Sequence, residues 1–218
     1  MSNIIQNVED RQIFQLLSLE AKLRGANFSS CLDVGCGMNP VEQWFRSYVK
    51  LTDAPYYAID VRSEVKEALK VRNIKVWHPD EISSDFSADL VIAQEVIEHI
   101  QPNDIPEFCF SLRGWTNKAL ALTCPNFVGF DPTRHCAIDP ELRFVPDHLK
   151  NFNPQSPDPN IHKTATTAEL IQDVLTRTFP DPDWSVNVYR AWPWLLADVP
   201  AKRSFLIYFK VFAIVWRN

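Results

Sequence analysis

A chain of 218 residues, 46% of them hydrophobic, is long enough to bury one sizeable core and predicts a single domain. Its formal net charge of −5 gives no support to a large surface built to neutralise nucleic-acid phosphates, although local basic patches are compatible with it. The five cysteines form no C-x-x-C pair and are odd in number, which argues against a disulfide framework and predicts reduced thiols in a cytoplasmic protein.

We expect neither a signal peptide nor a membrane-spanning segment. Residues 1–10 contain no basic stretch followed by an apolar one. The longest apolar run, residues 205–216, has 12 residues and is interrupted by Lys210. It is too short to cross a bilayer and predicts a strand, so we expect no membrane partner.

The first predicted element is a helix over residues 8–24, with Gly25 as its C-cap. Apolar residues recur along it at close to helical spacing, at Ile13, Leu16, Leu17, Leu19 and Leu23. We expect residues 1–29 to form an N-terminal helical segment that packs near a ligand or substrate mouth, or simply against the domain formed by residues 30–218.

The stretch 31–40, Cys-Leu-Asp-Val-Gly-Cys-Gly-Met-Asn-Pro, is an apolar run that ends at two glycines and leads into a helix start. This pattern is typical of a buried parallel strand, here residues 30–34, followed by a nucleotide-binding turn. Asn39 is a suitable N-cap and Pro40 suits the first helical position. We therefore predict a helix over residues 40–51 whose first N–H groups face a ligand carboxylate or phosphate.

The residues around the turn favour one ligand. A dinucleotide fingerprint has a third glycine where this chain has Pro40. Asp33 is a poor neighbour for a pyrophosphate and a good one for an ammonium, so S-adenosylmethionine fits better. The stretch resembles the first motif of the class I methyltransferases, D-x-G-x-G-x-G, with Asn39 at the third glycine. Asparagine tolerates a positive φ. The alternative is an ordinary strand–turn–helix without a ligand.

The next strands add two acidic positions. Residues 56–60 predict a second strand that ends at Asp60, where an acidic residue accepts hydrogen bonds from ribose hydroxyls. A surface aspartate that merely ends a strand is the alternative. A helix over residues 63–71 and a third strand over residues 74–77 follow. By the resemblance, Asp80 corresponds to the acidic residue that contacts the adenine amino group.

A second signature follows the fourth predicted strand, residues 88–93. The segment Gln94-Glu95-Val96-Ile97-Glu98-His99 resembles the E-x-x-E-H run that methyltransferases of this class often carry beside the sulfonium. A helix over residues 104–115 and a fifth strand over residues 118–123 come next.

An irregular segment then interrupts the pattern. Seven of the chain's 16 prolines lie in residues 125–159, where no helical or strand period is sustained. In this architecture it would cover the carboxyl edge of the sheet, so we expect a substrate lid at about 125–166. A loop of no chemical consequence is the alternative. A helix over residues 167–179 and two strands, residues 186–189 and 205–216, complete the chain.

Glu95, Glu98 and His99 stand at i, i+3 and i+4, and on a helical turn these positions share a face. With His162 they could hold a divalent metal. The set resembles the Mg²⁺-dependent small-RNA 3′-terminal 2′-O-methyltransferases, which have an E-x-x-E-H run and a later histidine before a threonine-capped helix. By that resemblance the four residues match the metal ligands, and the metal would bind the terminal hydroxyls and lower the pKa of the attacking oxygen.

Two alternatives for this cluster stay open. Small-molecule methyltransferases often carry the same run, and there Glu95 borders the cofactor while Glu98 and His99 make local hydrogen bonds or act as a general base. In the other alternative, Glu98 is a structural carboxylate that complements a helix dipole.

The resemblance implies an α/β fold, namely one doubly wound, mostly parallel seven-stranded sheet with an antiparallel last strand, and S-adenosylmethionine as cofactor, with Mg²⁺ if the cluster binds metal. His99 or His162 would be the catalytic base for a hydroxyl acceptor. The expected cofactor contacts are Asp33, Gly35, Cys36, Gly37, Asp60, Asp80 and Gln94. We expect O- or N-methylation of a small molecule; the alternatives are a metal-dependent RNA 3′-end enzyme and a non-catalytic cofactor-binding subunit. The oligomeric state is left open.

Overall fold

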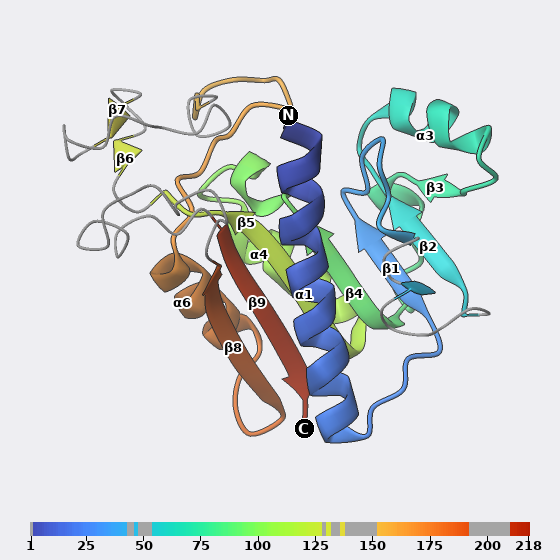
Figure 1. Cartoon of the computed structure of the whole chain (residues 1–218). Coiled ribbons are helices and arrows are strands. Elements are labelled where there is room, and N and C mark those ends of the chain that lie inside the picture. The colour runs from blue at the N-terminus through green and yellow to red at the C-terminus, as the bar shows by residue number, and fades with distance from the viewer. Residues whose placement is uncertain are drawn as a thin grey trace.

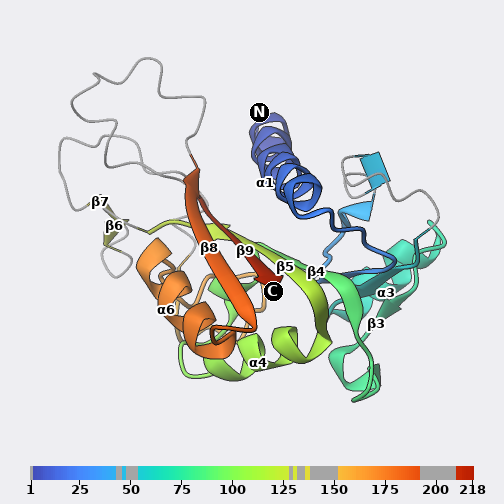
Figure 2. The same ribbon diagram turned by 90° about the horizontal axis from the view of Figure 1, so that it is seen from below.

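A computed structural model describes residues 2–42, 46–47, 54–127, 130–131, 136–137, 152–191 and 210–218. Its main feature is a seven-stranded sheet in the order β3-β2-β1-β4-β5-β9-β8, with helices on both faces (Figures 1 and 2). The elements are α1 (Ser2–Arg24), β1 (Cys31–Val34), β2 (Tyr56–Ile59), α3 (Ser63–Lys70), β3 (Val76–Trp77), the 3₁₀ turn η1 (Pro79–Glu81), β4 (Ala88–Gln94), the 3₁₀ turn η2 (Ile97–His99), α4 (Ile105–Trp115), β5 (Thr116–Pro125), β6 (Phe130–Asp131), β7 (Cys136–Ala137), α6 (Ala168–Thr178), β8 (Trp184–Ala191) and β9 (Lys210–Arg217).

The topology confirms the predicted fold class. β1 pairs in parallel with both β2 and β4, and β5 continues the parallel set. β9 is antiparallel to both of its neighbours, β5 and β8. The strand order reverses between β1 and β4, and ligands of open α/β sheets bind outside the carboxyl ends of the strands at such a point. Figure 1 shows β1, β2 and β4 pointing toward the end of the molecule at which α1 begins.

One face of the sheet is covered by α1. Phe14, Leu17 and other residues on one side of this helix pack against β4, β5 and β9. Glu20 anchors the helix, because its carboxylate accepts hydrogen bonds from the Tyr189 hydroxyl at 2.6 Å and from the Trp216 indole at 2.5 Å. The helix begins at residue 2 rather than at residue 8 as predicted. Leu19 and Leu23, which belong to the periodic apolar pattern of this helix, are exposed.

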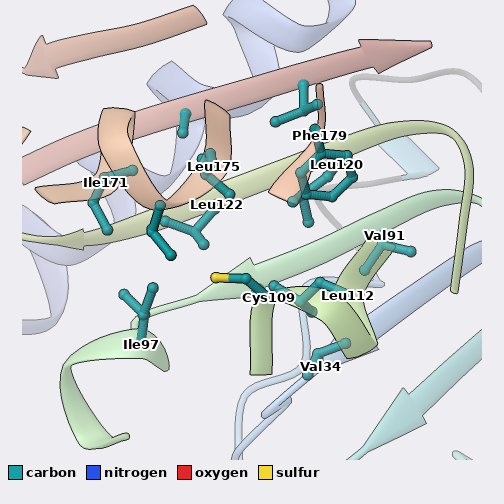
Figure 3. Close-up of a cluster of buried hydrophobic side chains, with 14 of the residues drawn as sticks. Val34, Val91, Ile97, Cys109, Leu112, Leu120, Leu122, Ile171, Leu175 and Phe179 are labelled. Carbon is teal, nitrogen blue, oxygen red and sulfur yellow. The ribbon is translucent and has the colours of Figure 1, made fainter. Parts of the chain in front are cut away.

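The opposite face is covered by α4 and α6, as Figure 2 shows. Cys109 and Leu112 of α4 and Ile171 and Leu175 of α6 meet the side chains of the central strands there (Figure 3). The predicted helix over residues 167–179 is confirmed as α6, with the Thr167 hydroxyl accepting a hydrogen bond from the Leu170 amide. The central strands are buried on both faces because helices cover both, which explains their continuous apolar runs.

Several predicted elements have different bounds or lie partly outside the described residues. The helix expected over 40–51 is described only at residues 40–42 and 46–47, and the predicted lid only in part. The last strand is described from Lys210, and the strand expected over 186–189 extends to Trp184–Ala191. Among the described residues, none of the helices is long and apolar enough to cross a membrane.

Candidate active site

The glycine turn after β1 has the predicted geometry. Gly35 and Gly37 have φ values of 68° and 57°, a left-handed region that favours glycine. The amides of Gly35 and Cys36 donate hydrogen bonds to the Ile59 carbonyl at 2.8 and 3.0 Å, which joins the turn to the end of β2. A Cβ on Gly35 would lie 2.5 Å from Val96 Cγ2, so the segment after β4 packs directly against this turn.

Asp33 lies beneath the turn, with 1% of its surface exposed. Its Oδ2 accepts hydrogen bonds from the Val41 amide, at 3.0 Å, and from the Tyr56 hydroxyl. Burial raises the pKa of Asp33 to about 6, although both hydrogen bonds lower it. In this structure Asp33 holds the turn against β2, and its expected contact with a ligand ammonium stays a prediction.

Asp60, at the end of β2, is bound on both carboxylate oxygens by its own chain. The Gly37 amide donates to Oδ2 at 2.9 Å. Arg62 donates three more hydrogen bonds, from its backbone amide and Nε to Oδ1 and from Nη2 to Oδ2. Burial alone would raise the pKa of Asp60, but the bonds from Arg62 and Gly37 lower it, so the carboxylate is ionised. Sequence reasoning missed Arg62.

Asp80 lies farther out, in the 3₁₀ turn η1. The sequence His78-Pro79-Asp80-Glu81 forms a capping box, in which the His78 ring accepts from the Asp80 amide and Glu81 accepts from the His78 amide. The Asp80 carboxylate is 90% exposed and 3.2 Å from His78 Nδ1. Its expected contact with adenine stays a prediction.

Glu95 leaves the strand in a left-handed conformation, with φ at 55° directly after Gln94, the last residue of β4. Its amide donates to the Thr123 carbonyl at 2.9 Å, and its carboxylate accepts from the Thr123 hydroxyl at 3.0 Å. Lys210, 4% exposed on β9, lies 3.5 Å from its other oxygen. The prediction that Glu95 shares a helix face with Glu98 was wrong, because the helical turn η2 begins only at Ile97.

Glu98, His99 and His162 converge although His162 is far away in the sequence. Their potential metal-ligating atoms all lie within 4.8 Å of one another. The rings of His99 and His162 pack edge to face, with centroids 4.8 Å apart. Glu98 is 1% exposed, and its Oε2 makes no hydrogen bond to any described residue. The structure thus brings three of the four predicted metal ligands into one cluster, with Glu95 beside it.

Backbone hydrogen bonds hold the His162 segment against η2. The amides of Lys163 and Thr164 donate to the Glu98 carbonyl at 2.7 and 3.0 Å, and the Thr164 hydroxyl donates to the Ile100 carbonyl at 2.7 Å. His99 Nδ1 lies 3.2 Å from the Ile161 carbonyl. Because a carbonyl can only accept, Nδ1 carries the proton and Nε2 is the unprotonated nitrogen.

Burial dominates the electrostatics of the cluster. It raises the pKa of Glu98 well above its usual value, and the negative charge of Glu95 adds to this effect. Burial also lowers the pKa of His99, an effect that its bond to the Ile161 carbonyl partly opposes. At neutral pH the cluster therefore offers an uncharged imidazole, which can accept a proton or bind a metal. Sequence reasoning missed Lys210, whose position beside Glu95 depends on the pairing of β9 with β5.

The sequence matches no protein-family model and no curated protein sequence. The fold does match solved structures. The plantazolicin methyltransferase BpumL in complex with SAH superposes with a TM-score of 0.63 at 15% identity, covering 100% of this chain and 88% of that one. A SAM-dependent methyltransferase from Archaeoglobus fulgidus gives a TM-score of 0.54 at 14% identity, covering 94% of each chain.

The Pnkp1/Rnl/Hen1 RNA repair complex contains a further match, with a TM-score of 0.54 at 16% identity over 87% of this chain and 38% of that chain. At such low identities these likenesses show the fold alone. The chain has the fold of the class I S-adenosylmethionine-dependent methyltransferases.

Proposed function

We propose that this chain is an S-adenosylmethionine-dependent methyltransferase that methylates a hydroxyl group of a small molecule. The observation that carries the proposal is the convergence of Glu98 and His99, in the turn η2 that follows the carboxyl end of β4, with His162 from the segment before α6. Ligands bind at this edge in open α/β sheets, which supports the proposal that the acceptor meets the cofactor beside this buried carboxylate and its two imidazoles.

The cofactor site is the glycine turn together with Asp60. S-adenosylmethionine supplies a methyl group that its sulfonium already activates. The turn keeps Cβ atoms away at Gly35 and Gly37, so that the chain can approach the methionine part. Asp60 is the proposed ligand of the ribose hydroxyls, because it stands at the carboxyl end of β2. The main task left to the protein is to align the acceptor with the methyl group and to exclude water.

His99 is the proposed base. The Ile161 carbonyl fixes the proton on Nδ1, so Nε2 can accept the proton that the acceptor hydroxyl loses as its oxygen becomes methylated. His162 packs against this ring and limits its orientation. Glu98 Oε1 lies 3.9 Å from His99 Nε2, beside the nitrogen that would take up the proton.

The cluster also fits a divalent cation. The buried Oε2 of Glu98 makes no hydrogen bond to any described residue, and metal binding would satisfy it. Two imidazoles and one carboxylate suit a transition metal better than Mg²⁺, which prefers oxygen ligands. Glu98, His99 and His162 would hold the cation, which would polarise the acceptor oxygen. Glu95 contributes a negative charge nearby while it stays bonded to Thr123 and Lys210.

The second candidate function is metal-dependent methylation of the 2′-hydroxyl at an RNA 3′ end. It is favoured by the position of His162, which joins Glu98 and His99 as the resemblance to those enzymes implies. An RNA with a terminal 2′,3′-diol offers two oxygens to such a cation, whereas a simple alcohol offers one.

Two measurements test the proposal. Calorimetry with SAH should show one binding site per chain; failure to bind SAH would refute it. Transfer of a labelled methyl group should then be compared between small hydroxyl compounds and a short RNA ending in a diol or in a 3′-phosphate. Activity on the diol RNA alone, lost on chelation of metal, would establish the second candidate.

A variant series tests the cluster. Glu98→Gln and His99→Asn should lower methyl transfer about 100-fold or more and leave SAH binding within about threefold of the wild type, because both residues lie on the acceptor side. Glu107→Gln, which removes an exposed carboxylate from α4, is the matched control. Equal activity of Glu98→Gln and Glu107→Gln would contradict a role for the cluster.

A further inference from the structure

The ribose-binding carboxylate expected at the end of β2 is already saturated. An ionised carboxylate accepts about four hydrogen bonds. Asp60 accepts four, one from Gly37 and three from Arg62, all at 2.9 to 3.0 Å. Ribose hydroxyls can bind Asp60 only when some of these donors leave. The Gly37 amide is fixed by the glycine turn and the Arg62 amide by the start of α3, so the side chain of Arg62 is the part that can move.

The guanidinium of Arg62 occupies the place that a ligand needs. Its Nη2 lies 3.5 Å from the position that a Cβ on Gly37 would take, so it covers the glycine turn as well as Asp60. The side chain is 25% exposed and therefore has solvent to move into. An arginine in this position blocks the turn on the side where glycine would allow a ligand to approach.

The remaining guanidinium nitrogen of Arg62 contacts the other half of the site. Its Nη1 donates to Asn160 Oδ1 at 2.7 Å. Asn160 lies two residues before His162, in the segment whose backbone is bonded to Glu98 and His99. One side chain thus connects the carboxylate expected to bind ribose with the segment that completes the acceptor cluster.

We propose that Arg62 is an internal competitor for the ribose site, and that cofactor binding moves its guanidinium off Asp60 and breaks its bond to Asn160. This inference rests on the proposed function, because it takes Asp60 to be the ribose ligand. Removal of the guanidinium from Asp60 then releases residues 158–160 at the same time as the cofactor binds. Arg62 is therefore a positioning residue that couples the two halves of the site.

The test is calorimetry with SAH on the full chain. Arg62→Met keeps the backbone bond to Asp60 and removes the two side-chain bonds to Asp60 together with the one to Asn160. If the open arrangement is populated at roughly 10% in the wild type, the variant should bind SAH about tenfold more tightly. Arg62→Lys cannot make the forked contact with Asp60, so its SAH affinity should lie between those of the wild type and Arg62→Met. Asn160→Ala leaves both bonds between the Arg62 side chain and Asp60 in place. It removes the bond from Arg62 Nη1 and the bond from the Asn160 side-chain amide to Asp158, and should tighten SAH binding about two- to threefold.

The matched control is Arg72→Met. Arg72 also donates to the glycine turn, at the Met38 carbonyl, but it does not contact Asp60. This variant removes the same charge and should bind SAH within about twofold of the wild type. If Arg72→Met and Arg62→Met tighten SAH binding equally, the tighter binding comes from the change in net charge, and the inference is overturned.

Hydrogen exchange distinguishes this coupling from a purely structural role of Arg62. The amides of Asp158 and Asn160 should exchange several-fold faster in the wild type when SAH is added. In Arg62→Met they should exchange fast without SAH and respond little to it. Binding of SAH by the wild type with weaker or unchanged binding by Arg62→Met would refute this inference and leave the methyltransferase proposal standing. Failure of both proteins to bind SAH would refute both.

Discussion

The ammonium of Lys210 lies 3.5 Å from a carboxylate oxygen of Glu95, at the point where β9 pairs with the end of β5. Lys210 is 4% exposed. The pair places a positive charge next to Glu95, which precedes η2, and near Glu98, which lies within η2. Glu95 is therefore held by Lys210 beside the Glu98–His99–His162 cluster.

Loss of Lys210 should be costly because it leaves a partly buried Glu95 without its counter-ion. We expect Lys210→Met to lower the free energy of unfolding by about 2 to 4 kcal/mol. The double variant with Glu95→Gln should lose less than the sum of the two single variants, because the neutral amide introduced at position 95 no longer needs the ammonium. Urea denaturation measures both values. Additive losses would show that the two side chains do not interact.

Metal binding should depend on Glu98 more than on Glu95. Glu98→Gln removes the buried oxygen that has no hydrogen bond to a described residue, so Mn²⁺ affinity should fall by about tenfold or more. Glu95→Gln should change it by less than about threefold, because Thr123 and Lys210 hold that side chain. Calorimetry with Mn²⁺ gives both affinities. Equal losses would indicate a four-ligand site, and no Mn²⁺ uptake by the wild type would leave His99 as a general base.

The buried Asp33 should make stability depend on pH. Its pKa in the fold is about 6, above its ordinary value of 3.8, so the folded chain binds this proton more tightly than the unfolded chain does. The resulting stabilisation is complete below the ordinary pKa and is lost as pH rises through about 6. Between about pH 4.5 and 7.5 the wild type should lose roughly 2 kcal/mol more than Asp33→Asn. Urea denaturation at both pH values checks this; parallel losses would contradict it.

Substitution of the two glycines of the turn by alanine should lower the stability of the protein by different amounts. In Gly35→Ala the new Cβ would lie 2.5 Å from the stiff, β-branched Val96. In Gly37→Ala the nearest atom is at 3.5 Å and belongs to the flexible Arg62. Both variants carry the strain of a positive φ, about 1 to 2 kcal/mol, and Gly35→Ala should lose at least about 1 kcal/mol more through the clash. Thermal unfolding ranks them, and equal losses would contradict the contact with Val96.

The fold followed from the sequence to a large extent. Apolar runs and capping residues predicted β1, β2, β4, β5, α4 and α6 within a few residues, because local periodicity and capping chemistry decide where such elements form. Burial on α1 was harder to predict. Leu19 and Leu23 fit the helical spacing but lie outside the side of α1 that packs against β4, β5 and β9. A periodic pattern gives the spacing of apolar residues along a helix, but not which side of that helix the sheet covers.

The site was predicted in part. Motif spacing and the family resemblance selected the glycine turn, Asp60, Glu98, His99 and His162, and the structure brings the last three together. Their roles toward a ligand stay predictions. The left-handed conformation of Glu95 was not predicted. The five residues from Glu95 to His99 are compatible with one helical turn, but they are equally compatible with a bend at Glu95 followed by the 3₁₀ turn η2, and the sequence does not distinguish the two.

By itself the sequence determined the strand–turn–helix at Gly35 and the acidic and imidazole groups that the chain can bring to a ligand, because these depend on neighbours within a few residues. Only the tertiary structure decided which of these groups meet. His162 reaches His99, Lys210 reaches Glu95 and Arg62 reaches Asn160 because strand pairing and loop docking bring distant segments together. These contacts also decide which side chains stay available, since a carboxylate that is saturated by its own chain cannot bind a ligand until a donor moves.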